Sequence, residues 1–302
     1  MPCYLKKESG EPEAKIKALY KILKNCTLCP RNCEVNRLEG EIGVCGASGE
    51  LMVSSGFAHF GEEPPLVGFY GSGTIFLAHC GLRCQFCQNF DISHKGDGVV
   101  SNPDQLAEMM LVLQERGCHN INFVTPTHYA PQIVEGIAKA AKEGLELPIV
   151  WNCGGYESLE VLKFLDGVVD IYMPDVKFFN RAYAKKYCGA ADYPDVVKEA
   201  LKEMHRQVGD LVIDSRGIAQ RGLLIRHLVM PNDVCDSEDI LRFIAEKFST
   251  NSYVNVMDQY RPCFKAYRFE EINRAVTEKE YEMAVKTAMR LRLTRGLCKP
   301  GL

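Results

Sequence analysis

From about residue 66 onward, short apolar runs alternate with segments of helical pattern, and no other feature restricts the possible folds as strongly. Six runs are rich in Val, Ile and Phe and almost continuously apolar: 74–79, 121–125, 148–152, 169–173, 222–230 and 253–257. Parallel strands covered on both faces have this pattern. Six strand–helix alternations therefore predict an α/β fold with a parallel sheet. Six is short of the eight units of a closed barrel, so a curved, incomplete barrel and an open doubly wound sheet both fit.

The helices predicted between these strands have recognisable ends. Asn102 and Pro103 provide a cap and a first-turn proline, and Gly117 closes that helix. A capping box at 277–280 opens a final helix that extends to about residue 293. Further helices are predicted at 13–24, 130–142, 157–165 and 237–248, with two more in 180–208 that are interrupted near Tyr193 and Pro194.

Composition excludes several classes of protein. The 302 residues include 36 basic and 39 acidic side chains, a net charge of -3, so a nucleic-acid partner is not expected. No apolar run approaches the roughly 20 residues that span a bilayer. The first residues lack the apolar stretch of a secretory signal. We expect a soluble, cytoplasmic protein without a membrane partner.

The cysteines carry the chemistry. In a reducing compartment disulfides rarely persist, so clustered thiols indicate metal or redox chemistry. Seven of the 14 cysteines fall into two groups, Cys26, Cys29, Cys33 and Cys45, and then Cys80, Cys84 and Cys87. The other seven are scattered, and most are expected to be small buried hydrophobes: Cys3, Cys118, Cys153, Cys188, Cys235, Cys263 and Cys298.

The second group follows the first predicted strand with the spacing Cys-x3-Cys-x2-Cys. Sites in parallel α/β folds are built at the C-terminal ends of strands, where this segment lies. Three thiolates on one loop can hold three irons of a cubane cluster and leave the fourth open to a small chelating ligand. Alternatively, positions i, i+4 and i+7 share one helical face, so three buried cysteines on a helix would have the same spacing in the sequence. Gly81 and the polar residues Arg83, Gln85 and Gln88 favour a loop.

The first group supplies four thiolates within 20 residues, in a glycine-rich segment too short to build a core. Such a segment can wrap a structural zinc or a second iron–sulfur cluster, and thiolates suit both. Cys3 could replace one of the four ligands. We predict three parts: a Cys-rich metal-binding lobe at 1–65, a core at 66–262 and a C-terminal helical extension at 263–302.

The loop with Phe86 before its last cysteine resembles the signature of radical S-adenosylmethionine (SAM) enzymes. The sequence is similar to relatives of pyruvate formate-lyase activating enzyme in three further segments: 88–93, 170–178 and 224–231. The resemblance covers about residues 66–262. The N-terminal cysteine group is similar to that of a longer, activating-enzyme-like branch of the superfamily.

The resemblance implies a partial (β/α)6 barrel, TIM-like but incomplete. It implies a [4Fe-4S] cluster on Cys80, Cys84 and Cys87, and SAM chelated to the unique iron. An electron donor such as flavodoxin or ferredoxin would drive cleavage of SAM to a 5′-deoxyadenosyl radical, which abstracts hydrogen from a substrate. In activating enzymes that substrate is a glycine of a partner protein. This chain departs from the family pattern at positions described next, so its substrate could also be a different protein, a peptide or a small molecule.

The resemblance also suggests residues that contact the cofactors, in addition to Phe86. Relatives hold the SAM amino group with an acidic residue after the second strand, but this chain has Thr125 and Thr127 there. The remaining candidates match family elements at later strand ends: Asn152, Asp175, Lys177, Arg226 and His227. Each also has a simpler interpretation. Asp175 and Lys177 could be an ordinary ion pair, His227 a core histidine and Asn152 part of a turn.

Other classes of function remain possible at this point. A two-centre iron–sulfur electron carrier would use the same thiols, although a carrier normally has four ligands per cluster. A zinc-stabilised binding module would contain zinc without iron. A nucleic-acid-modifying radical enzyme is disfavoured by the near-neutral charge.

Overall fold

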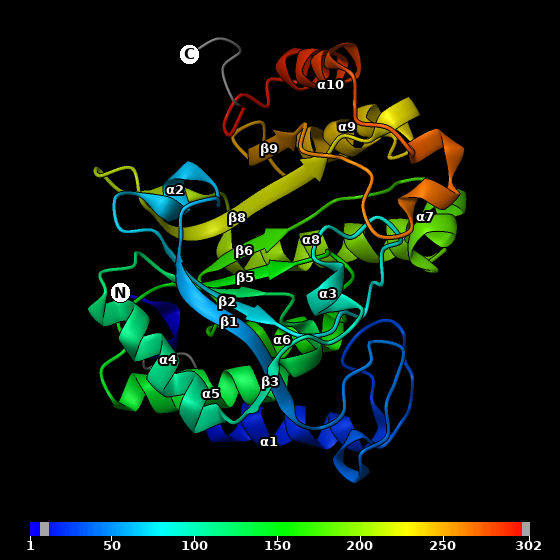
Figure 1. Cartoon of the computed structure of the whole chain (residues 1–302). Helices are drawn as coiled ribbons and strands as arrows, with labels where there is room; N and C mark the ends of the chain where they lie inside the picture. Colours follow the sequence, from blue (N-terminus) through cyan, green and yellow to red (C-terminus); the bar gives the residue numbers. More distant parts are fainter. Residues whose placement is uncertain (7–11, 298–302) are drawn as a thin grey trace.

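The computed structural model describes residues 1–6 and 12–297, and six parallel strands form its centre. They lie side by side in chain order (Figure 1): β2 (Ser72–Leu77), β4 (Ile121–Val124), β5 (Ile149–Cys153), β6 (Ile171–Pro174), β8 (Ala219–Leu228) and β9 (Tyr253–Met257). A doubly wound sheet would reverse its strand order, whereas this one does not. The sheet is not closed. The architecture is therefore a partial (β/α)6 barrel, as expected.

The apolar runs became strands because both faces of the sheet are covered. All five residues of β5 are buried, and all four of β6. Trp151 on β5 and Tyr172 on β6 are fully buried in the main core. Continuous burial explains why the sequence shows continuous apolar runs and no alternation.

The helices follow the predicted caps. Asn102 caps α4 in a reciprocal capping box with Gln105, and Thr277 does the same with Glu280 for the last helix. The longer helices are α1 (Pro12–Ile22), α4 (Pro103–Glu115), α5 (Ala130–Lys142), α6 (Leu159–Leu165), α7 (Arg181–Cys188), α8 (Tyr193–Val208), α9 (Ser237–Lys247) and α10 (Glu278–Arg290). Helix α5 packs between α1 and α4, and α6 packs on α8. No helix among the described residues is long and apolar enough to cross a membrane.

Short elements complete the chain. The short helices are α2 (Pro64–Val67), α3 (Phe90–Ser93), η1 (Cys3–Leu5), η3 (Leu23–Asn25), η4 (Arg37–Glu39), η5 (Thr127–Tyr129), η6 (Pro231–Asp233), η7 (Ala266–Arg268) and η8 (Glu270–Ile272). Three strands were not predicted, namely β1 (Leu51–His59), β3 (Val99–Ser101) and β7 (Val212–Ile213). Strand β1, which the sequence placed in the N-terminal lobe, pairs antiparallel with β2 and extends the sheet.

Arg37 and His128 link the N-terminal segment to the sheet. The buried guanidinium of Arg37 donates to the carbonyl oxygens of Ser48 and His128. Nε2 of His128 lies 2.8 Å from the carbonyl oxygen of Ala78, just beyond β2. Burial, together with the charge of Arg37, lowers the pKa of His128 to about 3. His128 is therefore neutral in the folded protein.

This pKa predicts a loss of stability on mild acidification. The unfolded state binds a proton near pH 6.5 but the folded state does not, so stability from His128 is present above pH 6.5 and falls below it. Between pH 7.5 and 5.5 we expect a loss of about 1.4 kcal/mol from this group. Urea unfolding of the apoprotein at both values measures it. His128→Gln should flatten the dependence; a slope in this variant equal to that of the unchanged protein would contradict the assignment.

Candidate active site

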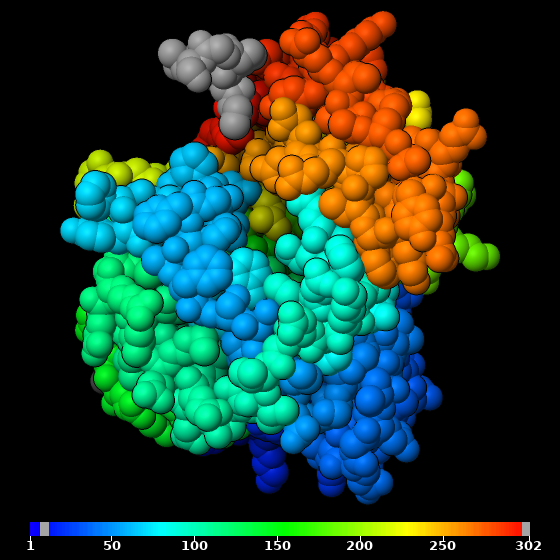
Figure 2. All heavy atoms as spheres, viewed as in Figure 1, coloured from blue at the N-terminus to red at the C-terminus, as the bar shows by residue number. Residues whose placement is uncertain are grey.

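A cavity of about 390 Å³ opens at the C-terminal ends of the parallel strands. Figure 2 shows the hollow at the centre of one face, between segments near residue 60 (blue), residues 80–90 (cyan) and residue 260 (orange). The loops after β2, β4, β5 and β6 line it, together with β8 and the end of β9. This is the place where parallel α/β folds build their sites.

The three-cysteine loop, residues 79–89, forms one wall of this cavity. It is irregular, with left-handed backbone at His79 (φ 71°) and Arg83 (φ 56°), so the alternative of three cysteines on one helical face is wrong. Cys80, Cys84 and Cys87 all line the cavity. Burial raises the pKa of Cys80 to about 12 and also raises that of Cys87. The free thiols are therefore protonated, and metal binding at this loop would release protons.

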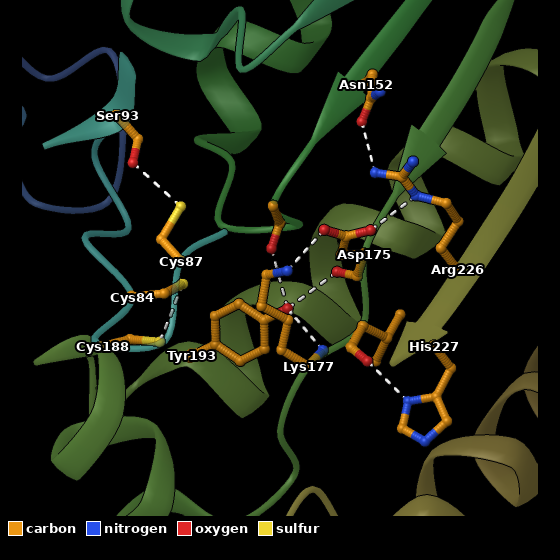
Figure 3. Close-up of polar contacts among 12 residues, drawn as sticks. Cys84, Cys87, Ser93, Asn152, Asp175, Lys177, Cys188, Tyr193, Arg226 and His227 are labelled. Atoms are coloured by element: carbon orange, nitrogen blue, oxygen red, sulfur yellow. Dashed lines mark hydrogen bonds and ion pairs between the residues drawn. The ribbon is translucent and has the colours of Figure 1, made fainter. Parts of the chain in front are cut away.

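A fourth thiol touches the loop. Cys188, at the end of α7, donates to the sulfur of Cys84 across 3.5 Å in a buried contact (Figure 3). The neighbouring Cys188 thiol, together with burial, raises the pKa of Cys84 well above its usual value. Sequence reasoning missed Cys188, because nothing in its local sequence separates it from the other scattered cysteines.

Arg31 ties this region together from the N-terminal segment. Its guanidinium donates to the carbonyl oxygens of Gly81 and Leu82 in the three-cysteine loop. It also donates to the carbonyl oxygens of Cys188 and Gly189 at the end of α7. One arginine thus fixes the loop relative to the helix that carries Cys188.

Opposite the thiols lies a charge network of Asp175, Lys177, Arg226 and Asn152 (Figure 3). The carboxylate of Asp175 accepts from Arg226 Nε at 2.8 Å through Oδ1 and from Lys177 Nζ at 2.6 Å through Oδ2. Arg226 Nη2 donates to Asn152 Oδ1 at 2.7 Å. The ion pair predicted as an alternative interpretation is present, but it lies inside the cavity with a second cation.

The network fixes its own protonation states. Burial would raise the pKa of Asp175, but the charges of Arg226 and Lys177 outweigh it and hold this pKa below normal. Burial would lower the pKa of Lys177, but the charge of Asp175 outweighs it. The hydroxyl of Tyr193 accepts from Lys177 N and lies 2.9 Å from the carbonyl oxygen of Asp175. Asp175, Lys177 and Arg226 therefore all remain charged in the folded protein.

A further carboxylate in the cavity was not predicted. Glu62 Oε2 lies 3.5 Å from Arg226 Nη1, and the Glu62 side chain is 7% exposed. Burial raises the pKa of Glu62 despite the nearby arginine. Glu62 is distant in sequence from every strand that carries the network, so only the fold shows this proximity.

Two of the predicted residues are not brought into the cavity. Thr125 lines it with left-handed backbone (φ 61°), but Thr127 donates its hydroxyl to Glu157 Oε1 at 2.7 Å. The side chain of His227 is fully buried, with Nδ1 2.9 Å from the carbonyl oxygen of Val176 and Nε2 3.0 Å from Ser237 Oγ. His227 is thus a satisfied core histidine. The cavity does contain the others: Cys80, Cys84, Phe86, Cys87, Thr125, Asn152, Asp175, Lys177 and Arg226.

The N-terminal cysteine group, Cys26, Cys29, Cys33 and Cys45, lies beside the three-cysteine loop. A Cβ at Gly81 would be 3.4 Å from Cys29 Sγ. Burial, reinforced by the three neighbouring thiols, raises the pKa of Cys29 to about 12. Over the described ranges, no three Cys, His, Asp or Glu side chains are arranged to hold a single metal ion. Cys3 lies elsewhere: its backbone N–H donates to Asp170, which immediately precedes β6.

Comparison with known proteins decides the family. Residues 74–244, more than half of the chain, match the sequence model of the Radical SAM superfamily. The chain belongs to the radical SAM superfamily. An uncharacterised protein of Methanocaldococcus jannaschii is 36% identical over 290 residues, which cover 93% of this chain and 79% of that protein. The crystal structure of methylornithine synthase is 16% identical with a TM-score of 0.49, over 74% of this chain and 63% of that one, less than two thirds of its length.

As a radical SAM protein, the chain is an enzyme that uses a [4Fe-4S] cluster and SAM. The donor set in the cavity fits both groups. In a cubane cluster each thiolate holds its own iron, so three thiols spread along one loop suit it better than a single ion. SAM carries a carboxylate, an ammonium and a sulfonium, and the cavity offers both signs of charge on Lys177, Arg226, Asp175 and Glu62.

Proposed function

We propose that Cys80, Cys84 and Cys87 hold the [4Fe-4S] cluster and that the facing charge network binds SAM. One observation carries this proposal: three thiols of a single loop and the Asp175–Lys177–Arg226 network line the same cavity. When bound and reduced, the cluster supplies the electron that cleaves SAM to methionine and a 5′-deoxyadenosyl radical, which abstracts a hydrogen atom from the substrate.

The residues of this chain bind, orient and protect. Lys177 and Arg226 offer cationic donors to a carboxylate, and Asn152 and Glu62 offer acceptors to an ammonium group. Because Asp175 pairs with both cations, they stay fixed before SAM binds, and little reorganisation is needed. Leu82, Phe86 and Tyr260 line the cavity with apolar surface that excludes water and competing hydrogen donors.

The activating-enzyme-like subtype is the finer part of the proposal. Its support is the motif resemblance at 88–93, 170–178 and 224–231. The substrate would then be a glycine of a protein partner, and flavodoxin or ferredoxin would supply electrons in the cytoplasm. The division into residues 1–65, 66–262 and 263–302 belongs to the same proposal.

A second metal centre on the N-terminal cysteine group, zinc or iron–sulfur, is also proposed. Its support is that four thiols lie within 20 residues of sequence and that burial, together with neighbouring thiols of the group, raises the pKa of both Cys29 and Cys45. Metal analysis of the variant Cys29→Ser/Cys45→Ser should show loss of one zinc, or of the iron of one cluster. Cys235→Ser, a buried cysteine outside both groups, should retain all metal. Equal metal content in both variants would contradict a second centre.

The proposed function is tested on anaerobically purified, reconstituted protein. We expect at least about four iron atoms and four sulfides per chain. With dithionite and SAM, the protein should form 5′-deoxyadenosine. Zinc as the sole metal, or an iron-loaded protein that forms no deoxyadenosine with or without candidate substrates, would contradict the proposal.

The contact of Cys188 with Cys84 predicts a shift in reduction potential. A donor to a cluster thiolate stabilises the more negative, reduced state, so its removal lowers the potential. A hydrogen bond worth about 1 kcal/mol corresponds to ~40 mV for one electron. Redox titration followed by electron paramagnetic resonance (EPR) should show this downward shift in Cys188→Ala. Cys118→Ala, a buried cysteine at the other end of the sheet, should show none; an unshifted Cys188→Ala would mean that Cys188 does not contact the cluster ligand.

A further inference from the structure

A second cavity of about 650 Å³ adjoins the first. It lies between residues 61–64 at the start of α2, residues 255–259 at and just after the end of β9, and helix α10. Gly61, Glu62, Met257 and Gln259 line both cavities. In Figure 1, β9 lies below α10, and α2 lies to the left of both. We call the second cavity the acidic groove, for the charges described next.

Five carboxylates and one amine line the acidic groove: Glu62, Glu63, Asp258, Glu278, Glu282 and Lys286. The amine of Lys286 is already paired with Glu282 at 2.6 Å. Arg226, from the first cavity, lies 3.5 Å from Glu62 and 4.0 Å from Glu63. Asp258 and Glu278 are exposed and form no ion pair within the described part of the chain. The groove therefore retains a net negative charge.

Glu63 provides an independent sign of a missing partner. Its side chain is only 5% exposed, and Oε1 accepts from Asn255 Nδ2 at 3.0 Å. Its other oxygen, Oε2, is buried without any hydrogen-bond partner. Native proteins rarely leave a buried carboxylate oxygen unpaired, because the lost hydration is costly. This wall of the groove therefore contains a carboxylate oxygen that lacks a donor.

Much of the remaining lining is apolar, apart from Asn255 and Gln259. Pro64, Val256, Tyr281, Val285 and Met289 contribute hydrocarbon and aromatic surface between the carboxylates. An occupant that satisfies both kinds of lining has a hydrocarbon stem that ends in a cation.

We propose that the acidic groove binds the substrate, and that this substrate carries an aliphatic cation, an ammonium or guanidinium on a hydrocarbon stem. The inference rests on the proposed function, because the shared lining places the occupant beside the cavity assigned to SAM. A free amine and a lysine or arginine side chain of a peptide have the same chemistry. The experiment distinguishes these two sources.

The test measures binding by isothermal titration calorimetry to the reconstituted holoenzyme with SAM. The probes are free lysine and a blocked Gly-Gly-Lys-Gly-Gly peptide, each compared with its norleucine counterpart. We expect at least one lysine probe to bind about tenfold more tightly than its neutral twin. Binding of the peptide alone identifies a peptide substrate. If neither lysine probe binds more tightly than its norleucine counterpart, the proposal is overturned.

Matched variants locate the binding. Asp258→Asn/Glu278→Gln should remove most of the preference for lysine, because it removes the two unpaired carboxylates. Glu108→Gln/Glu115→Gln on α4 makes the same change in net charge outside the groove and should keep the preference. Equal preference in both double variants would place the cation elsewhere and overturn the proposal.

Basal deoxyadenosine formation without any probe separates the two claims. If deoxyadenosine forms and no charge-dependent binding is found, the acidic groove does not bind a cationic substrate, and the proposed radical SAM site stands. If iron-loaded protein forms no deoxyadenosine either with or without candidate substrates, the proposed radical SAM site is wrong, whatever the binding probes show.

Discussion

Replacing Cys84 with alanine should remove the iron of the three-cysteine loop and abolish 5′-deoxyadenosine formation. Cys84 is the buried central thiol of this loop and lines the cavity with Cys80 and Cys87. Two thiolates leave a cubane cluster with two iron atoms without a protein ligand, so it should not survive purification. Iron analysis and a SAM cleavage assay measure both effects.

The neighbouring thiol must be included in this experiment. Because Cys188 Sγ lies 3.5 Å from Cys84 Sγ, it could take over as a ligand in Cys84→Ala. The double variant Cys84→Ala/Cys188→Ala closes that route, and Cys118→Ala serves as the control for loss of a buried thiol. Iron content and SAM cleavage in the double variant equal to those of the control would refute the assignment of the loop.

Replacing Asp175 with alanine should cause the largest loss of stability in the cavity. Among the described residues, Asp175 is the one acceptor of Lys177 Nζ and one of the two side-chain acceptors closest to Arg226. The side chains of Asp175, Lys177 and Arg226 are mostly buried. Its removal leaves two buried cations without their main counter-charge. Breaking a buried ion pair in this way lowers the free energy of unfolding by about 3–5 kcal/mol. Urea unfolding of the apoprotein measures this loss. SAM binding to the holoenzyme should be lost in parallel.

Two further variants separate charge from packing. Asp195→Ala breaks an exposed ion pair with Arg181 on the surface and should cost less than about 1 kcal/mol. Asp175→Ala/Arg226→Met removes one of the stranded cations and should recover part of the lost stability. If Asp175→Ala is no more destabilised than Asp195→Ala, the network does not hold the cavity together.

The strands and most helices could be predicted because their signals are local. The six parallel strands are buried on both faces, so they read as apolar runs, and residues such as Asn102 and Thr277 cap helices at short range. Strand β1 was missed since only two of its nine positions are buried and it contains Ser54, Ser55 and Gly56. Its partner β3 is three residues long and mostly exposed, so it has no periodic pattern to detect.

The candidate site was predictable where residues follow strand ends, and not where partners come from distant segments. Asn152, Asp175 and Arg226 converge because adjacent parallel strands end at one edge. Thr127 does not reach the cavity, because the chain turns at Thr125 and the hydroxyl of Thr127 donates to Glu157 instead. Glu62 lines the cavity, and Arg31 and Cys188 contact the three-cysteine loop. All three come from segments whose local sequence does not show that they lie near the site.

The central claim is that SAM binds to a cluster held by the three-cysteine loop. The most direct measurement is electron–nuclear double resonance on the reduced holoenzyme with SAM labelled by ¹⁵N in its amino group and ¹⁷O in its carboxylate. We expect hyperfine coupling of both labels to the cluster spin, and its loss in Cys84→Ala/Cys188→Ala. A cluster signal that is the same with and without labelled SAM would contradict this account.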